Sequence, residues 1–149
     1  MIDQRDHIPP QSIARAIIET KHEIPFFSSM VQGGVPSPAE TYIERRLDLN
    51  DLCMAHPEAS YFVRVTGDSM IGDRIEPGDV LVVDSSRTPS EGKIVVVWVD
   101  GGHSVKRIRY VGKMVVLESS NEKYLPIYVH AGDAFSILGV VTHNIQTVK

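Results

Sequence analysis

The sequence contains a single cysteine, Cys53, among its 149 residues. No internal disulfide can therefore form, and a reducing compartment such as the cytoplasm is expected. Free cysteines behave mostly as small buried apolar residues, so we expect a structural thiol at this position rather than a nucleophile.

Long hydrophobic runs are also absent. No window of the sequence approaches the ~20 apolar residues that a transmembrane helix needs. The charged N-terminus, residues 1–7, is not followed by the apolar core of a secretory signal. We therefore expect a cytoplasmic protein without membrane attachment.

An excess of basic charge is missing as well. Fifteen Lys and Arg residues stand against 19 Asp and Glu residues, which gives a formal net charge of −4. Proteins dedicated to nucleic-acid binding normally carry a basic face, so direct, sequence-specific DNA recognition is not expected. The local group Lys106, Arg107, Arg109 and Lys113 is interpreted mainly as a solvated strand edge.

The first forty residues differ in character from the rest. Ser12 could cap a short helix in which Ile13, Ala14 and Ile17 share one face. Small and turn-forming residues fill positions 26–38, which predicts a flexible segment accessible to a peptidase. Residues 1–40 are therefore interpreted as an N-terminal arm, which is too short for a helix-turn-helix domain.

Residues 41–149 are predicted to form a β-rich domain. A short helix is expected over 48–56, where Pro57 stops it. Runs rich in Val, Ile, Tyr and Phe, separated by turn signals, then predict strands at 61–65, 80–84, 93–99, 104–110, 114–117, 127–129 and 135–141. Short strands at this spacing indicate a mainly β fold, a twisted sandwich or a partly open barrel. Asp100-Gly101 predicts a tight hairpin that places Lys106 on the returning strand.

Ser69 is the candidate nucleophile. It follows the predicted strand 61–65 within Thr66-Gly67-Asp68-Ser69-Met70, so a sharp turn could present it beside free backbone N–H groups. A Gly-x-Ser after a strand is more often only a turn, and Ile71 stands where the α/β-hydrolase elbow needs glycine.

A nucleophilic serine needs a base. None of the histidines has a motif to support that role, or the spacing to a second ligand that a metal pair needs, although a Ser–His pair assembled in space stays open. They are His7, His22, His56, His103, His130 and His143. The acidic residues Asp68, Asp73, Glu76 and Asp79 lack the alternating spacing of a calcium loop, so neither metal nor cofactor is expected.

Lysine is the other possible base, because burial in apolar surroundings lowers the pKa of a lysine by several units. Lys106 faces the nearly all-apolar run 94–99 across the predicted hairpin. The competing interpretation is that its side chain merely extends outward into solvent.

Three separated segments resemble the LexA/UmuD family of self-cleaving serine–lysine peptidases, and its UmuD-type members most closely. Gly67-Asp68-Ser69-Met70 with 75–84 resembles the serine-bearing segment, and 99–108 resembles the lysine-bearing hairpin. Residues 30–39 look like the cleavage region, and 139–143 look like the final strand. The resemblance covers almost the whole chain.

This resemblance implies Ser69 as nucleophile, Lys106 as general base, and the backbone N–H groups of Asp68 and Ser69 as oxyanion hole. It implies a scissile bond between Gly33 and Gly34. Relatives usually have Ala or Cys before that bond, so Gly33 predicts slow cleavage, because it offers no anchoring side chain.

The same resemblance implies a homodimer of the SOS response that cleaves itself when a RecA filament on single-stranded DNA stimulates it. The trimmed dimer would then be the accessory subunit of an error-prone Y-family translesion polymerase. The alternative is a non-cleaving dimeric module that recruits a polymerase and carries a vestigial peptidase site. A third interpretation is a signal peptidase, which shares the serine–lysine pair. It is disfavoured because it would need a membrane anchor, and no such segment is expected here. Cleavage in cis or in trans, the identity of the polymerase and the role of residues 1–10 remain open.

Overall fold

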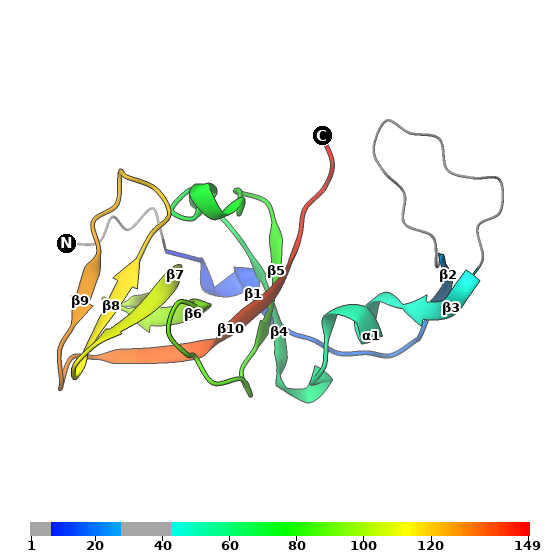
Figure 1. Cartoon of the computed structure of the whole chain (residues 1–149), viewed down its shortest axis with the longest axis horizontal. Coiled ribbons are helices and arrows are strands. Elements are labelled where there is room, and N and C mark those ends of the chain that lie inside the picture. Colours follow the sequence, from blue (N-terminus) through cyan, green and yellow to red (C-terminus); the bar gives the residue numbers. More distant parts are fainter. Residues whose placement is uncertain (1–6, 28–42) are drawn as a thin grey trace.

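The computed structural model describes residues 7–27 and 43–149, which are mainly β (Figure 1). The strands are β1 (Ile13–Arg15), β2 (Glu23–Phe27), β3 (Ile43–Asp48), β4 (Ser60–Arg64), β5 (Val80–Asp84), β6 (Ile94–Val99), β7 (Gly102–Val111), β8 (Met114–Glu118), β9 (Ile127–Val129) and β10 (Phe135–Ile145). The helical elements are η2 (Pro10–Ser12), α1 (Leu49–Cys53), η3 (Pro57–Ala59) and η4 (Ile71–Asp73).

One antiparallel sheet of eight strands dominates the molecule. Its order is β1-β4-β5-β10-β6-β7-β8-β9, and the sheet is not closed into a barrel. Strands β2 and β3 form a separate two-stranded ribbon. The prediction of a mainly β fold is therefore confirmed.

The seven predicted strands of the later residues are all present, and the bounds of β5 and β9 coincide with the prediction. The predicted hairpin between β6 and β7 is confirmed, because Val99 pairs with Gly102 across a two-residue turn. Asp100 (φ 50°) and Gly101 (φ 83°) both take the positive φ that such a turn requires.

The helix predicted around Ile13 is wrong. Residues Ile13–Arg15 form β1 and pair with β4, with Ile13 opposite Val63. A short isolated helix is costly to nucleate, whereas the edge of β4 offers hydrogen bonds to an extended chain at once. Ile17, which was expected to share a helix face with Ile13 and Ala14, lies beyond β1 and is 79% exposed.

The predicted helix at 48–56 is present but shorter, as α1. Asp48 caps it, since its carboxylate accepts a hydrogen bond of 2.7 Å from the N–H of Asn50. The same carboxylate accepts a bond from the N–H of His22, so the cap also fixes the preceding chain.

Apolar side chains gather on both faces of β6. Val96 belongs to a core cluster with Val63, Leu81 and Val105, whereas Val95 and Val97 belong to a second cluster with Ile108 and Leu117. Successive side chains of a strand point to opposite faces, so a strand covered on both sides reads as a continuous apolar run.

The described N-terminal residues belong to both parts of the fold. Strand β1 joins the large sheet, and Ile8 joins the core cluster of Val63 and Val105, whereas β2 belongs to the separate ribbon. Figure 1 shows the β2–β3 ribbon and α1 at one end of the molecule and β7, β8 and β9 at the other. The flexible segment predicted over 26–38 begins too early, because Phe26 and Phe27 belong to β2 and pair with β3. Its remaining residues, with Gly33 and Gly34, lie outside the described residues.

Candidate active site

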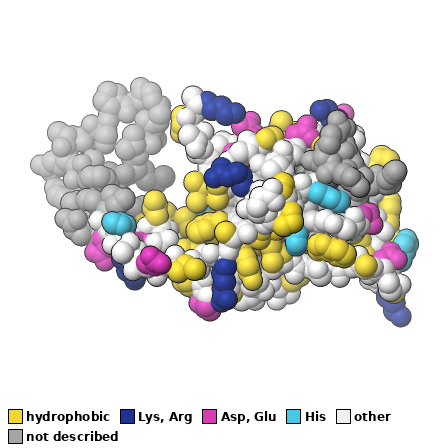
Figure 2. Space-filling model, turned by 180° about the vertical axis from the view of Figure 1, so that it is seen from behind, with side chains coloured by type: hydrophobic (Ala, Val, Ile, Leu, Met, Phe, Trp, Pro, Cys, Tyr) yellow, Lys and Arg dark blue, Asp and Glu magenta, His cyan; other side chains and the backbone are white. Residues whose placement is uncertain are grey.

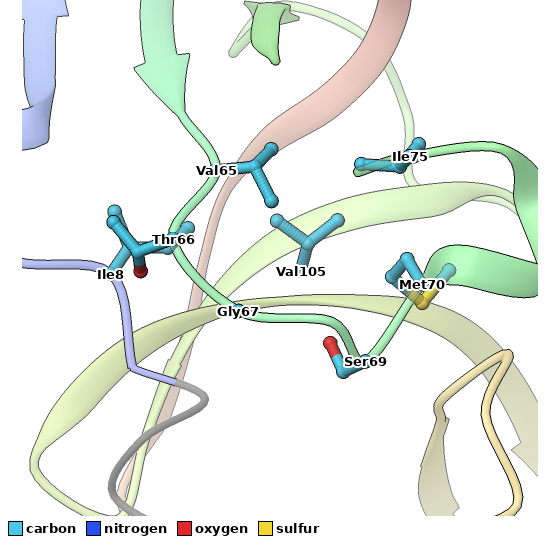
Figure 3. Close-up of a pocket in the computed structure, with 8 residues that line it drawn as sticks. All are labelled: Ile8, Val65, Thr66, Gly67, Ser69, Met70, Ile75 and Val105. Carbon is cyan, nitrogen blue, oxygen red and sulfur yellow. The ribbon is translucent and has the colours of Figure 1, made fainter. Parts of the chain in front are cut away.

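Ser69 lies on the connection between β4 and η4, where the chain leaves the sheet. Val65, just after β4, is held by two backbone hydrogen bonds of 2.8 Å to Asp79 and Gly78. The chain then turns through Thr66 and Gly67, and Ser69 is only 4% exposed. Figure 3 shows its hydroxyl turned toward a small pocket.

This pocket is mainly apolar. Besides Ser69 it is lined by Ile8, Val65, Thr66, Gly67, Met70, Ile75 and Val105 (Figure 3). Val105 comes from β7 and directly precedes Lys106, so the pocket connects the serine-bearing turn with the lysine-bearing strand.

Lys106 is a buried residue of β7. It lies opposite Val95 of β6, and its side chain is 1% exposed. The interpretation of an outward-pointing lysine on a solvated strand edge is therefore wrong. Its Nζ donates a hydrogen bond of 2.8 Å to Ser119 Oγ and lies 5.3 Å from the ring centroid of Tyr124, within the range of a cation–π contact.

The loop that follows β8 holds the serine-bearing turn through Asp68. The hydroxyl of Tyr124 donates a hydrogen bond of 2.5 Å to Asp68 Oδ1, and Lys123 Nζ lies 3.2 Å from Oδ2. The side chain of Asn121 donates to the carbonyl of Asp68 at 2.9 Å. The hydrogen bonds from Tyr124 and then Lys123 lower the pKa of Asp68, so its carboxylate stays ionised.

Tyr124 is the residue that links the two candidates. Its hydroxyl binds the residue before Ser69, while its ring faces the amine of Lys106. The sequence motifs did not point to the loop 119–124. The feature that marks it in the sequence is the polar run Ser119-Ser120-Asn121, which follows the apolar strand β8.

A second contact with this loop comes from η4. Arg107 Nη2 lies 2.7 Å from Asp73 Oδ1, and Ser120 Oγ donates to the same carboxylate. Burial alone raises the pKa of Asp73, but the hydrogen bonds from Ser120 and Arg107 outweigh burial and lower it. Arg107 therefore ties the lysine-bearing strand to the helix that follows Ser69.

No histidine lines the pocket of Ser69. His56 forms the one Ser/His/Asp contact among residues 7–27 and 43–149, with Ser86 Oγ at 3.1 Å and Asp84 Oδ2 at 2.8 Å. Both partners meet the same ring nitrogen, Nδ1, so the imidazole cannot relay a proton from the serine to the carboxylate.

The described residues contain no group of three or more His, Cys, Asp or Glu side chains arranged to hold a metal ion. No helix in that part of the chain is long and apolar enough to cross a bilayer. Figure 2 shows basic and acidic side chains interspersed over one face, where neither sign gathers.

Comparison with known proteins gives the family. The profile described as Peptidase S24-like matches residues 25–142. The chain belongs to this family. The LexA/UmuD resemblance inferred from the motifs is thereby confirmed.

Individual relatives agree with this assignment. The chain is 40% identical over 126 residues to Protein MucA of Salmonella typhimurium, covering 83% of this chain and 85% of the relative. It is 38% identical to Protein ImpA of Escherichia coli over 127 residues, 84% and 85% of the two chains. A LexA repressor from Anaeromyxobacter dehalogenans is 38% identical over 121 residues, but these are 80% of this chain and only 53% of the repressor.

Proposed function

We propose that this protein is a serine peptidase that cleaves its own chain between Gly33 and Gly34, with Ser69 as nucleophile and Lys106 as general base. The observation that carries the proposal is the position of Tyr124, which contacts Asp68 beside the serine and the amine of the buried lysine. The catalytic pair and the cleaved bond are inferences from the motifs, supported by the family and by this contact.

The reaction follows the general scheme of a serine nucleophile with a neutral amine as base. Ser69 Oγ attacks the carbonyl carbon of Gly33, and Lys106 Nζ accepts the hydroxyl proton. The oxyanion is held by the backbone N–H groups of Asp68 and Ser69. The C–N bond then breaks, the ammonium returns its proton to the amine of Gly34, and an ester between Oγ and Gly33 remains. Water, deprotonated by the same amine, hydrolyses that ester and restores the serine.

The position of Lys106 supports its proposed role. It is 1% exposed, and Val105, the residue before it, lines the mainly apolar pocket of Ser69. The proposed base is therefore enclosed by the protein beside the serine-bearing turn.

We further propose that the trimmed protein acts as a dimeric accessory subunit of a Y-family translesion polymerase in the SOS response. A RecA filament on single-stranded DNA would stimulate the cleavage. These roles come from the LexA/UmuD resemblance, and the family membership supports them.

The cleavage is tested by incubating the pure protein at mildly alkaline pH, which favours a neutral amine, and following its intact mass. We expect a product that begins at Gly34. Ser69→Ala and Lys106→Met should each slow its formation by about 10³-fold or more, because both groups act as one unit. Lys113→Met, at an exposed lysine, is the matched control and should cleave like the wild type.

An unchanged mass, even after addition of a RecA filament on single-stranded DNA, would contradict the peptidase proposal. In that case the protein would be the binding module of the alternative interpretation, and its association with a polymerase would have to be independent of Ser69.

A further inference from the structure

The N-terminal residues 7–10 lie against the β6–β7 hairpin, directly beside the pocket of Ser69. The N–H of Ile8 donates a hydrogen bond of 2.6 Å to the carbonyl of His103, and the two residues form an antiparallel β-bridge. On the other side, Thr66 Oγ1 donates to the carbonyl of His7 at 3.3 Å. The segment therefore connects β7 to the turn that carries Ser69.

Ile8 is one of the side chains that line the pocket. Its side chain is 4% exposed and packs in the core cluster with Val65, Met70 and Val105. Figure 3 shows Ile8 beside Thr66, at the edge of the pocket into which Ser69 points. The space left over is about 10 Å³, roughly the room needed for one water molecule. A second aliphatic side chain cannot enter while Ile8 is in place.

The edge of β7 that Ile8 occupies is suited to bind an extended peptide. Strand β8 pairs only with residues Arg107–Val111 of β7, so the first half of β7 has β6 on one side and no strand of the described sheet on the other. Exposed strand edges bind extended peptides through their backbone groups. A peptide bound along this half of β7 would pass both the pocket of Ser69 and Lys106.

The imidazole of His7 also packs against the β6–β7 hairpin, at Gly102. Its Nε2 is buried and has no hydrogen-bond partner within the described part of the chain. A Cβ on Gly102 would overlap the imidazole of His7, so the ring depends on the missing side chain at that position. Burial, and then the neighbouring His7, lower the pKa of His103, which agrees with two imidazoles held close together.

The segment is also built to resist cleavage. The bond after Ile8 leads into Pro9, which has no N–H, and the residue before a proline is held in an extended conformation. Pro9 itself has φ −59° and ψ 141°. The segment is extended and carries an aliphatic side chain, as a substrate would. The Ile8–Pro9 bond, however, lacks the N–H that other peptide bonds have.

We propose that residues His7–Pro10 are an intramolecular competitor that occupies the peptide-binding groove beside Ser69, with Ile8 in the place of a substrate's aliphatic side chain. This proposal rests on the proposed function, because it requires Ser69 to be the nucleophile. It gives residues 7–10 a role: a peptide reaches Ser69 only when this segment has left the groove.

The proposal is tested by the reactivity of Ser69 in the full-length protein toward an alkyl fluorophosphonate, which labels nucleophilic serines and needs no peptide substrate. Ile8→Ala and Gly102→Ala should each increase the labelling rate about tenfold, as expected if the groove is covered about nine-tenths of the time. Ile17→Ala is the control, because Ile17 lies in the same N-terminal stretch but is exposed. A synthetic peptide of residues 7–12 should return the Ile8→Ala protein to the wild-type rate.

The outcomes separate the two proposals. If Ser69→Ala abolishes labelling but both groove variants react at the wild-type rate, the competitor is refuted and the nucleophile stands. If Ser69 stays unlabelled in every variant, the nucleophile is refuted, and the competitor with it. Gly102→Ala leaves the core side chain of Ile8 in place, so it decides the question should Ile8→Ala fail to fold.

Discussion

Asp84 is a buried polar residue that serves the fold rather than the pocket of Ser69. It is 3% exposed and accepts hydrogen bonds from His56 Nδ1 at 2.8 Å and from the N–H of Ser86 at 2.9 Å. Burial alone raises the pKa of Asp84, but the hydrogen bonds from His56 and Ser86 outweigh burial and bring it down to about 2. The carboxylate thereby joins the end of β5 to the segment before β4.

This lowered pKa predicts how stability depends on pH. A carboxyl whose pKa falls on folding stabilises the protein above its ordinary pKa and loses that contribution as pH falls toward the folded value. We expect Asp84→Asn to lower the free energy of unfolding by about 2 kcal/mol near pH 7. In urea unfolding the difference from wild type should shrink between about pH 4 and pH 2. Asp51→Asn, which breaks an exposed ion pair with Lys21, should change stability far less. A constant difference across that range would exclude the Asp84 explanation.

At the scale of elements, η4 packs against the loop 119–124 beside the candidate site. The N–H of Gly72 donates a hydrogen bond of 2.8 Å to the carbonyl of Ser120. A Cβ on Gly72 would lie 2.7 Å from that same oxygen, closer than van der Waals contact allows. Only glycine lets the helix after Ser69 approach the loop that holds Lys106 through Ser119.

Gly72→Ala is therefore expected to push the loop away and to slow self-cleavage about tenfold, since a misplacement of about 1 Å can cost more than this. The protein should stay folded, because neither Gly72 nor the loop belongs to a core cluster of the described residues. Ile71→Ala, at the exposed neighbouring position of η4, is the matched control. Equal cleavage rates in the two variants would show that this contact does not position the site.

The elements that the sequence predicted are those whose signal is local. Strand β5 and the Asp100-Gly101 turn follow from β-branched residues and from a turn that demands positive φ. Strand β1 did not follow, because Ile13–Arg15 become a strand only when β4 is beside them. The same reason applies to the site. Ser69 and Lys106 stand in motifs, whereas Tyr124 gains its importance from contacts with Asp68 and Lys106 that are distant in sequence.

At the scale of the whole molecule, the ends of the described ribbon lie far from the candidate site. Strands β2 and β3 flank the segment that contains Gly33 and Gly34, and Figure 1 shows them at the opposite end from β7. If the protein cleaves itself as proposed, the serine belongs either to the same chain or to a second copy of the protein.

We expect cleavage between copies, because it needs no rearrangement of β2 and β3 within one chain. A tagged Ser69→Ala protein mixed with wild type should be cut between Gly33 and Gly34, at a rate that rises with the wild-type concentration. Tagged Ser69→Ala with added Lys106→Met protein is the control and should stay intact. A cleavage rate of the wild type that is independent of concentration, with the Ser69→Ala chain untouched, would instead indicate cleavage within a chain.

Strand β10 holds the two halves of the candidate site together. It lies between β5 and β6 in the sheet, so it joins the half that carries Ser69 to the half that carries Lys106. Both neighbours of β10 lie far from it in the sequence, and such distant pairings form late in folding. A refolding chain is therefore expected to bring Ser69 and Lys106 into one sheet only after β10 has entered between β5 and β6.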